Sequence, residues 1–512
     1  MKIGSSTASE QVKSSSQSPE TAQAAVRALF EALNGAGIRY CHWKSNWKLA
    51  EALRGDTDID LLVDRSDAAR FQSLIASFGY KPGVGDASPS ICHYYGLDEA
   101  DGRLVHLHVY YRIITGGTVL KNHRLALEHM LLAGARPIEG VFVPQRTPEL
   151  VCFVVRKTLE YVAIIEALLL AREGKSVGRE LAWLSEGVSD DEIARLLRDH
   201  LPMLDLELWR RCQQAIVSAS TVRRYSLARA LASRLRPNTR YGRLQAMMIR
   251  SRRVLERLAL RLRGTPSGDV LLSGGAVIAV VGSDGAGKST IVGELAAWLG
   301  ECLTVRSIHA GKPPPSPMTL VPRLLLPLLR RLTPRYRTTS VEMAADETSA
   351  RGPAALRRRR LFLLYPLRAL MLAHERKRLL IRAHRQAARG MLVVSDRYPT
   401  SQRGVPEGPA LAFLLDDRNP LYAWLARLEG RAYRAIPPPD VVLHLEVSVD
   451  LACHRNLTRD KPGGPKPTPY IRRRHAQSSG LDFASTAIHP VNTASGLAET
   501  LRSVKGIVWR AL

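Results

Sequence analysis

The segment from Gly282 to Ser289 reads G-S-D-G-A-G-K-S, and it constrains the fold of this chain more than any other stretch. An apolar, β-branched run at residues 276–281 precedes it and predicts a buried parallel strand. Apolar residues at helical spacing in residues 289–300 predict a helix directly after it. A glycine-rich loop between a strand and a helix lets backbone N–H groups converge on phosphates, so the sequence predicts a nucleoside triphosphate site in an α/β fold. The alternative is an ordinary glycine-rich turn.

The residues of this loop have distinct predicted roles. Glycine permits backbone conformations and close approaches that a Cβ would obstruct. Lys288 is expected to reach the β- and γ-phosphates, and the hydroxyl of Ser289 is expected to bind Mg²⁺. ATP and Mg²⁺ are therefore the predicted cofactors. The predicted nucleotide contacts in the loop are Gly282, Ser283, Gly285, Ala286, Gly287, Lys288, Ser289 and Thr290.

Length, charge and cysteine content bound the class of protein. A chain of 512 residues is too long for one typical core, so two or three domains are expected. The formal net charge of +27 favours anionic ligands or surfaces. The six cysteines are scattered without a C-x-x-C pair, which indicates neither a disulfide framework nor a zinc site and fits a reducing cytoplasm. No apolar run is long enough to span a bilayer. We expect a cytoplasmic protein, with attachment to a membrane surface left open.

Composition changes along the chain predict three folded regions after a tail. Residues 1–19 are rich in Ser, Gln and Lys and are predicted to be a disordered tail. Residues 20–148 mix helix and strand patterns, which is typical of a small α/β domain. Residues 149–263 are helical in pattern and basic, and we interpret them as a connecting region. A short Gly/Pro/Ser run follows as a linker. Residues 269–512 form the predicted α/β domain that carries the phosphate loop.

Within the small α/β domain, helices are expected at residues 21–35 and 66–79 and strands at residues 58–63 and 104–112.

Asp396 and Arg397 follow an apolar run at residues 391–395 that predicts another strand of the phosphate-loop domain. In a doubly wound parallel sheet the carboxyl ends of the strands line the ligand crevice, so both side chains are expected near the phosphates. The alternative is a structural ion pair at a strand end. Further strands are expected at residues 303–309 and 441–447, and a long helix at residues 370–389.

Three motifs of this domain together resemble thymidylate kinase. They are G-S-D-G-A-G-K-S-T at residues 282–290, A-H-E-R at residues 373–376 and V-V-S-D-R-Y at residues 393–398. The resemblance begins at about Gly274 and extends over the rest of the chain. It implies a P-loop fold like that of nucleoside monophosphate kinases, with a parallel sheet and flanking helices. It also implies transfer of the γ-phosphate of ATP to dTMP or a related phosphorylated acceptor.

The resemblance implies a role for each residue that matches on the ATP side. Asp284 matches an aspartate between the metal and the acceptor sugar, and Asp396 is implied to organise Mg²⁺. Arg455 matches a residue that packs on the adenine of ATP. Residues 455–474 are basic and contain P-G-G-P, which is typical of a mobile lid, and Arg459 is the implied catalytic arginine of that lid.

On the acceptor side, the resemblance implies that Arg397 holds the acceptor phosphate and that Arg376 lies near the acceptor base. Lys312 occupies the position of an Arg-rich turn and is a further predicted substrate contact. The chain departs from the family pattern at residues 404–406, which read G-V-P where the family has residues that contact thymine. Val281 also replaces a common acidic residue. These departures put the thymidylate acceptor in doubt and leave the kinase chemistry in place.

A second motif, G-D-T-D-I-D-L-L-V at residues 55–63, follows Ser45 and resembles nucleotidyltransferases of the DNA polymerase β type. Strand alternation places Asp58 and Asp60 on one face, where two carboxylates can bind metal ions. Lys44 is a further candidate contact to the phosphates. The expected third carboxylate is missing, because the candidate strand carries His106 and His108 instead. Either a histidine substitutes as ligand or the site is degenerate, and a solvated strand end is the alternative for the aspartates.

Basic segments suggest partners other than the substrate. Arginine runs at residues 250–263 and 357–360 are usually solvated helix faces whose arginine stems cover apolar surface. Leucines alternate with the arginines, which favours peripheral contact with an anionic membrane over nucleic-acid recognition. No aromatic platform for nucleic acid accompanies them, so specific nucleic-acid binding is not expected. A phosphorylated small molecule is the expected partner and a homodimer the expected assembly. Two other functions stay open: nucleotidyl transfer at the amino-terminal site, in surface-polysaccharide or sugar-nucleotide metabolism, and an ATP-gated scaffold without turnover.

Overall fold

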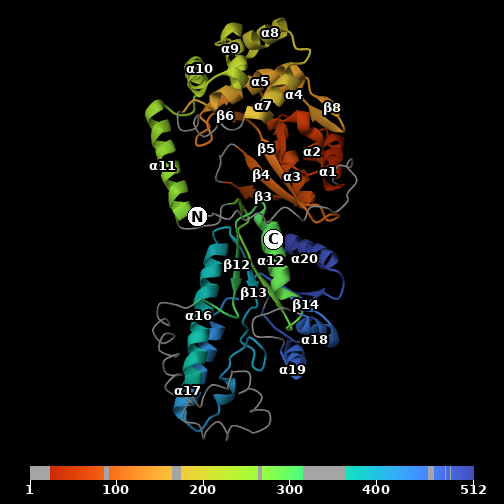
Figure 1. The fold of residues 1–512 in the computed structure, drawn as a ribbon, viewed down its shortest axis with the longest axis vertical. Helices are drawn as coiled ribbons and strands as arrows, with labels where there is room; N and C mark the ends of the chain where they lie inside the picture. The colour runs from red at the N-terminus through yellow and green to blue at the C-terminus, as the bar shows by residue number, and fades with distance from the viewer. Residues whose placement is uncertain are drawn as a thin grey trace, which may run out of the picture.

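A computed structural model describes residues 24–85, 91–163, 174–262, 268–314, 364–458, 466–478, 480–484 and 486–512. The chain is a mixed α/β protein, as predicted from its sequence. An amino-terminal mixed sheet lies between a helical region and a carboxy-terminal sheet that is entirely parallel (Figure 1).

The amino-terminal sheet has the strand order β1-β2-β5-β4-β3-β10. β2 and β5 are parallel, and every other neighbouring pair is antiparallel. Helices α1 (Ala24–Gly35) and α3 (Ala68–Ser77) pack on one face of this sheet. Leu29 of α1 and Phe71 of α3 are buried there in one core cluster with Leu107 of the sheet. The strands are β1 (Tyr40–His42), β2 (Ile59–Val63), β3 (Lys81–Val84), β4 (Cys92–Leu97), β5 (Leu104–Tyr110) and β10 (Val270–Leu271). The helices and strands predicted for this region are confirmed, apart from residues 21–23, which lie outside the described residues.

The helical region packs around Phe153 and Trp209, which are both buried. Three of its helices begin at a capping side chain: Ser189, Asp205 and Ser220 each accept a hydrogen bond from a first-turn N–H. Its helices are α5 (Arg146–Leu159), α7 (Gly174–Ser185), α8 (Asp190–His200), α9 (Leu206–Ser218), α10 (Thr221–Arg234) and α11 (Arg243–Leu262). α4 (Glu128–Ala133) and the hairpins β6 (Ile113–Thr115)–β7 (His123–Leu125) and β8 (Arg136–Ile138)–β9 (Val141–Val143) connect them to the amino-terminal sheet.

The carboxy-terminal sheet has five parallel strands in the order β12-β13-β11-β14-β15. α12 (Lys288–Gly300) and α20 (Leu497–Ala511) cover one face, and α16 (Leu364–Ala387) packs on the other. The strands are β11 (Val277–Gly282), β12 (Val305–His309), β13 (Leu392–Asp396), β14 (Val441–Glu446) and β15 (Ile488–Asn492). The remaining helices are α17 (Pro420–Arg434), α18 (Val449–Leu457) and α19 (Thr468–Ser478). The strands and helices predicted here are confirmed, and β11 stands in the centre, so the phosphate loop leaves from the middle of the sheet.

The two sheets belong to units that pack directly against each other. β10 comes from the start of the carboxy-terminal region and pairs with β3 of the amino-terminal sheet. Trp509 on α20 donates its indole N–H to the carbonyl of Gly79 at 3.2 Å, and Lys505 Nζ donates to the carbonyl of Gly102 at 2.8 Å. One core cluster contains Tyr95 of β4 together with Trp509. The contact is therefore both apolar and hydrogen-bonded.

Several sequence predictions fall on residues that the structure does not describe: the tail at 1–19, most of the linker, the arginine run at 357–360, and Arg459 with the P-G-G-P segment. Among the helices that are described, none combines the length and the apolar character needed to cross a bilayer.

Candidate functional site

The phosphate loop connects β11 to α12, as predicted. Gly282 and Gly285 have φ values of 138° and 90°, in the left-handed region that favours glycine. A Cβ on Gly282 would lie 2.5 Å from the carbonyl oxygen of Leu445, and one on Gly285 would lie 2.6 Å from that of Ala452. The loop therefore needs glycine at both positions, because backbone from β14 and α18 closes against it.

Lys288 begins α12 with its side chain folded back over the loop and only 6% exposed. Its Nζ donates to the carbonyl oxygens of Gly282 at 3.0 Å and Ser283 at 2.6 Å, and the nearest carboxylate oxygen, on Asp284, is 3.9 Å away. Burial, followed by the charge of Arg397, lowers the pKa of Lys288 to about 8. Among the described residues, the hydrogen-bond partners of this cation are thus two neutral carbonyls, which suits it to an anionic ligand.

Ser289, in the first turn of α12, meets Asp396 at the carboxyl end of β13. The Ser289 hydroxyl donates to Asp396 Oδ2 at 3.0 Å, whereas the buried Oδ1 of Asp396 has no hydrogen-bond partner among the described residues. A buried carboxylate oxygen without a partner is unfavourable. Hydroxyl and carboxylate oxygens are ligands that Mg²⁺ prefers. The chemistry of this pair is therefore suited to a Mg²⁺ ion, and its role as the metal ligands stays a prediction.

Arg397 links the phosphate loop to a second carboxylate. Its Nη2 donates to Asp284 Oδ1 at 2.6 Å and its Nη1 to Glu407 Oε1 at 2.7 Å. Its backbone N–H donates to the carbonyl of Val280 at 3.0 Å, although its φ of 71° is unfavourable for a residue with a side chain. Such conformations persist where the surroundings fix them, and they are frequent at functional sites. Burial opposes the charge on Arg397, but Glu407 and Asp284 raise its pKa.

Glu407 lies between three arginines. Arg376 Nη2 donates to its Oε2 at 2.5 Å, and Arg397 and Arg474 donate to its Oε1 at 2.7 and 3.4 Å. Arg376 also donates to the hydroxyl of Tyr433 at 2.7 Å. Burial opposes ionisation of Glu407, but the three arginines outweigh it and hold its pKa below the usual range. Sequence reasoning missed Glu407, which follows the segment where the thymidylate kinase pattern is lost.

Asp284 receives a third cation, Lys466, from the segment just before α19. Lys466 Nζ lies 3.0 Å from Asp284 Oδ2. Burial opposes ionisation of Asp284, but Arg397, Lys288 and Lys466 together depress its pKa. Five cationic side chains surround Asp284 and Glu407, and we call them the cationic cluster. They are Lys288, Arg376, Arg397, Lys466 and Arg474. In the described part of the chain, ion pairs join the cluster to two carboxylates, Asp284 and Glu407, so the cluster favours additional negative charge.

Other predicted site residues lie at its margin. Arg455 donates to the carbonyl of Thr493 at 2.7 Å, so its guanidinium is held at the end of β15. Lys312 is exposed on the turn after β12, which passes Arg397 closely, because a Cβ on Gly311 would lie 2.7 Å from the Arg397 Cδ. Thr290 is exposed in the first turn of α12. Their roles remain predictions.

The amino-terminal site brings Asp58 and Asp60 onto one face, as alternation predicts. Lys44 Nζ donates to Asp60 Oδ1 at 2.7 Å, and His108 Nδ1 lies 3.5 Å from the same oxygen. His106 Nδ1 lies 2.9 Å from Asp58 Oδ1. Burial opposes ionisation of both aspartates, but Lys44 and His108 at Asp60, and the two histidines at Asp58, hold their pKa values below the usual range. Mg²⁺ binding by these aspartates stays a prediction.

Ser45, in the turn before this site, has a left-handed φ of 55° and donates its backbone N–H to Glu180 Oε1 at 3.2 Å.

Comparison with known proteins adds a structural similarity. No protein-family model matches the chain, and no curated protein matches its sequence. A solved structure of thymidylate kinase from Candida albicans is similar to this chain with a TM-score of 0.27 and 17% sequence identity. The similarity covers 46% of this chain and 90% of the kinase.

Proposed function

We propose that the carboxy-terminal half is a phosphotransferase that moves the γ-phosphoryl group of ATP to a small phosphorylated acceptor, with a nucleoside monophosphate such as dTMP as the first candidate. The observation that carries this proposal is the cationic cluster beside the Ser289–Asp396 pair. Phosphoryl transfer depends on alignment and positive charge more than on a general base. A site with five cations, two paired carboxylates and a place for Mg²⁺ suits that reaction.

On the ATP side, the phosphate loop and Lys288 bind and orient the donor phosphates. Lys288 gives up two carbonyl contacts, at 3.0 and 2.6 Å, when its ammonium turns to an anion. Ser289 and the unpaired Oδ1 of Asp396 hold Mg²⁺. When bound, Mg²⁺ neutralises charge on the phosphate oxygens. These side chains start on rigid elements, so the donor is positioned with little rearrangement.

On the acceptor side, Arg397 is the proposed contact to the acceptor phosphate. It bridges Asp284 of the donor loop and Glu407, so one guanidinium joins the two parts of the site. Arg376 donates three hydrogen bonds, to Ala310, Tyr433 and Glu407, which hold its guanidinium in one position. We propose that this fixed side chain lines one side of the acceptor site. An acceptor that already carries a phosphate is a good nucleophile and needs no added base.

The test is product analysis with ATP labelled either at the γ- or at the α-phosphate, in the presence of Mg²⁺. The full chain is offered dTMP, the other nucleoside monophosphates and sugar phosphates, and Lys288→Ala is the inactive control. We expect the γ label to appear on a monophosphate with the intact chain and not with Lys288→Ala.

Two other outcomes contradict the proposal. Transfer of the α label would assign turnover to nucleotidyl transfer at the amino-terminal Asp58–Asp60 site. Binding of ATP with no label transferred to any acceptor would support a nucleotide-gated scaffold instead.

Helix α11 supports a second proposal, peripheral contact with an anionic membrane surface. Apolar side chains recur at helical spacing along it and are exposed: Leu244, Met247, Met248, Val254, Leu255, Leu258 and Leu262. Arg243, Arg252 and Arg257 are exposed beside them. An exposed apolar stripe flanked by arginines suits the interface of an anionic bilayer.

Vesicle co-sedimentation tests this proposal. We expect binding to vesicles that contain phosphatidylserine, weaker binding at high salt, and loss of binding in Leu255→Ser/Leu258→Ser. Leu421→Ser on α17 is the matched control for an exposed leucine elsewhere. Equal binding to neutral vesicles, or none to either kind, would contradict it.

A further inference from the structure

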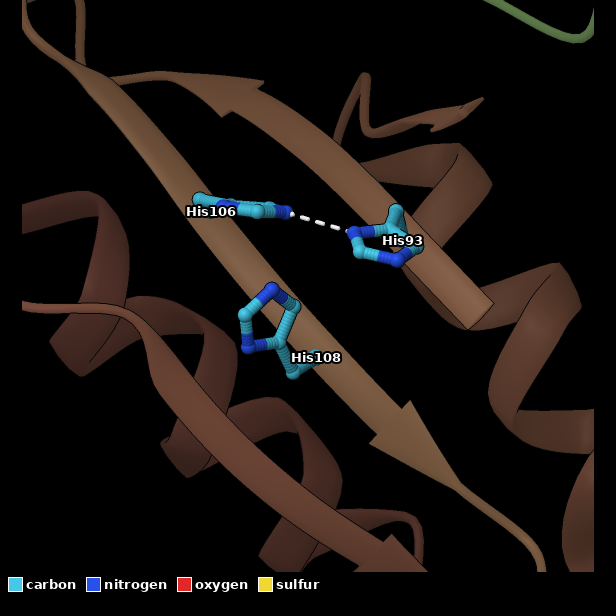
Figure 2. A group of neighbouring side chains, drawn as sticks. All are labelled: His93, His106 and His108. Atoms are coloured by element: carbon cyan, nitrogen blue, oxygen red, sulfur yellow. Dashed lines mark hydrogen bonds between the residues drawn. The ribbon is translucent and has the colours of Figure 1, made fainter. Parts of the chain in front are cut away.

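Three histidines gather on the face of the amino-terminal sheet opposite helices α1 and α3. His93 comes from β4, and His106 and His108 come from β5 (Figure 2). One ring nitrogen from each histidine lies within 4.8 Å of the others, and no other such group of three occurs in the part of the chain that the structure describes.

Strand register brings these residues together. His108 is the direct partner of His93 on β4 and of Asp60 on β2, so the three side chains form a row across adjacent strands. His106 stands two residues before His108 and therefore on the same face, next to Asp58. The cluster is thus fixed by pairing in the sheet and does not depend on a mobile loop.

Carboxylates orient two of the rings. His106 Nδ1 lies 2.9 Å from Asp58 Oδ1, and because a carboxylate only accepts, this nitrogen carries the proton and Nε2 presents a lone pair. His108 Nδ1 similarly faces Asp60 Oδ1 at 3.5 Å and Asp58 Oδ2 at 3.8 Å. A histidine that binds a metal usually donates its other N–H to a carboxylate in this way.

His93 completes the arrangement. Its Nδ1 lies 3.1 Å from His106 Nε2 and 2.9 Å from Asp269 Oδ2, so it is the ring nitrogen that faces the cluster. A metal ion at this nitrogen takes the place of its proton, and Nε2 then carries the proton of the ring. The side chain is only 6% exposed. Two imidazole nitrogens on one tetrahedral zinc ion are separated by roughly 3.3 Å, given bonds of about 2.0–2.1 Å, so the observed spacing is close to what such an ion requires.

We propose that His93, His106 and His108 bind one divalent transition-metal ion of the zinc class, with Asp58 and Asp60 orienting two of the rings. Asp269, which also accepts a hydrogen bond from the hydroxyl of Tyr95, lies beside His93. Imidazole ligands favour zinc and its neighbours, whereas Mg²⁺ prefers oxygen. The site thus differs in metal class from both the Ser289–Asp396 pair and the Mg²⁺ site predicted for the two aspartates. Cysteine spacing could not predict this metal site, because all three proposed ligands are histidines.

Cobalt binding to the metal-depleted full chain tests the proposal, because tetrahedral Co²⁺ absorbs strongly in the visible range and octahedral, oxygen-bound Co²⁺ does so weakly. The titration contains excess Mg²⁺, which occupies oxygen sites such as Ser289–Asp396. We expect one tightly bound Co²⁺ per chain with a tetrahedral spectrum, displaced by Zn²⁺. His106→Gln and His108→Gln should each abolish that spectrum, and Asp58→Asn should weaken binding about 10- to 100-fold.

His200→Gln, at the end of α8 and remote from the cluster, is the matched control and should keep the spectrum. His93 is buried and its substitution carries a risk of misfolding, so the two variants on β5 carry the test. Zn²⁺ should raise the melting temperature of the unaltered chain and of His200→Gln but not that of His108→Gln. Absence of tetrahedral Co²⁺, its displacement by Mg²⁺, or its survival in both β5 variants would overturn the proposal.

Discussion

The phosphate-loop site and the histidine site differ in the charge of the side chains that line them. In the carboxy-terminal site, five cations surround two carboxylates, and among the described residues Lys288 donates its hydrogen bonds to backbone carbonyls. In the amino-terminal site, three imidazoles lie among three carboxylates. The first arrangement suits an anion and the second a cation, so one chain holds two sites of opposite preference.

Buried carboxylates show the same contrast. Glu407 keeps its charge because three arginines contact it. Glu149 on α5 is 4% exposed and its Oε2 has no hydrogen-bond partner among the described residues. Burial raises the pKa of Glu149 to about 8. A buried carboxylate of this protein therefore stays ionised where cationic side chains contact it directly.

Arg397→Ala gives the largest expected effect and separates the two sites. Because the guanidinium bridges donor loop and Glu407, we expect γ-phosphate transfer to fall about 10³-fold. Co²⁺ binding at the histidine site should not change, because no residue of the cationic cluster contacts it. Steady-state kinetics and the cobalt titration on the same preparation measure both.

Two controls accompany this variant. Arg397→Lys keeps the charge and loses the two-pronged geometry, so it should recover only part of the activity. Arg472→Ala on α19 removes an arginine that is 61% exposed and should be neutral. Equal loss of transfer and of Co²⁺ binding in Arg397→Ala would mean that the two sites are not independent.

Glu407→Gln tests the buried carboxylate of the cationic cluster. Removing its charge leaves Arg376, Arg397 and Arg474 without a common counter-ion, so we expect the free energy of unfolding to fall by about 3 kcal/mol. Glu446→Gln, whose carboxylate is 55% exposed, should change stability by less than about 0.5 kcal/mol. Urea denaturation compares the two. A neutral result for Glu407→Gln would show that the arginines are solvated well enough to need no partner.

The sequence predicted the strand, glycine-rich loop and helix around residues 277–300 well because their signals are local. Gly282 to Ser289 are contiguous, and the strand that delivers Asp396 and Arg397 is an uninterrupted apolar run. Glu407, Lys466 and Arg474 come from segments between or after these elements, and only the folded chain brings them to Asp284 and Arg397. No spacing rule connects them in sequence.

The histidine site was only partly predictable for a similar reason. His106 and His108 were noticed because they replace an expected carboxylate, but His93 lies on β4, where both faces are buried and alternation of polarity is lost. Its position opposite His108 depends on strand register, which is a non-local property. Asp269 was assigned to the start of the phosphate-loop domain, and the two-residue strand β10 beside it is too short to predict.

Glu149→Gln tests whether a buried carboxylate without an ion-pair partner is neutral inside this protein. The pKa of Glu149 is about 8 in the folded chain and near the ordinary value of 4.5 when unfolded, so the folded state binds the extra proton between these values. Stability contributed by the protonated form is full below about pH 4.5 and is lost as the pH rises towards 8. Glutamine keeps the neutral shape, so Glu149→Gln should match the unaltered chain at low pH. Near pH 8 it should be more stable, because the unfolded chain with glutamate must take up a proton on folding and the glutamine variant need not. Urea denaturation across this range measures the difference, and a constant difference at every pH would mean that Glu149 is ionised in the folded chain despite its burial.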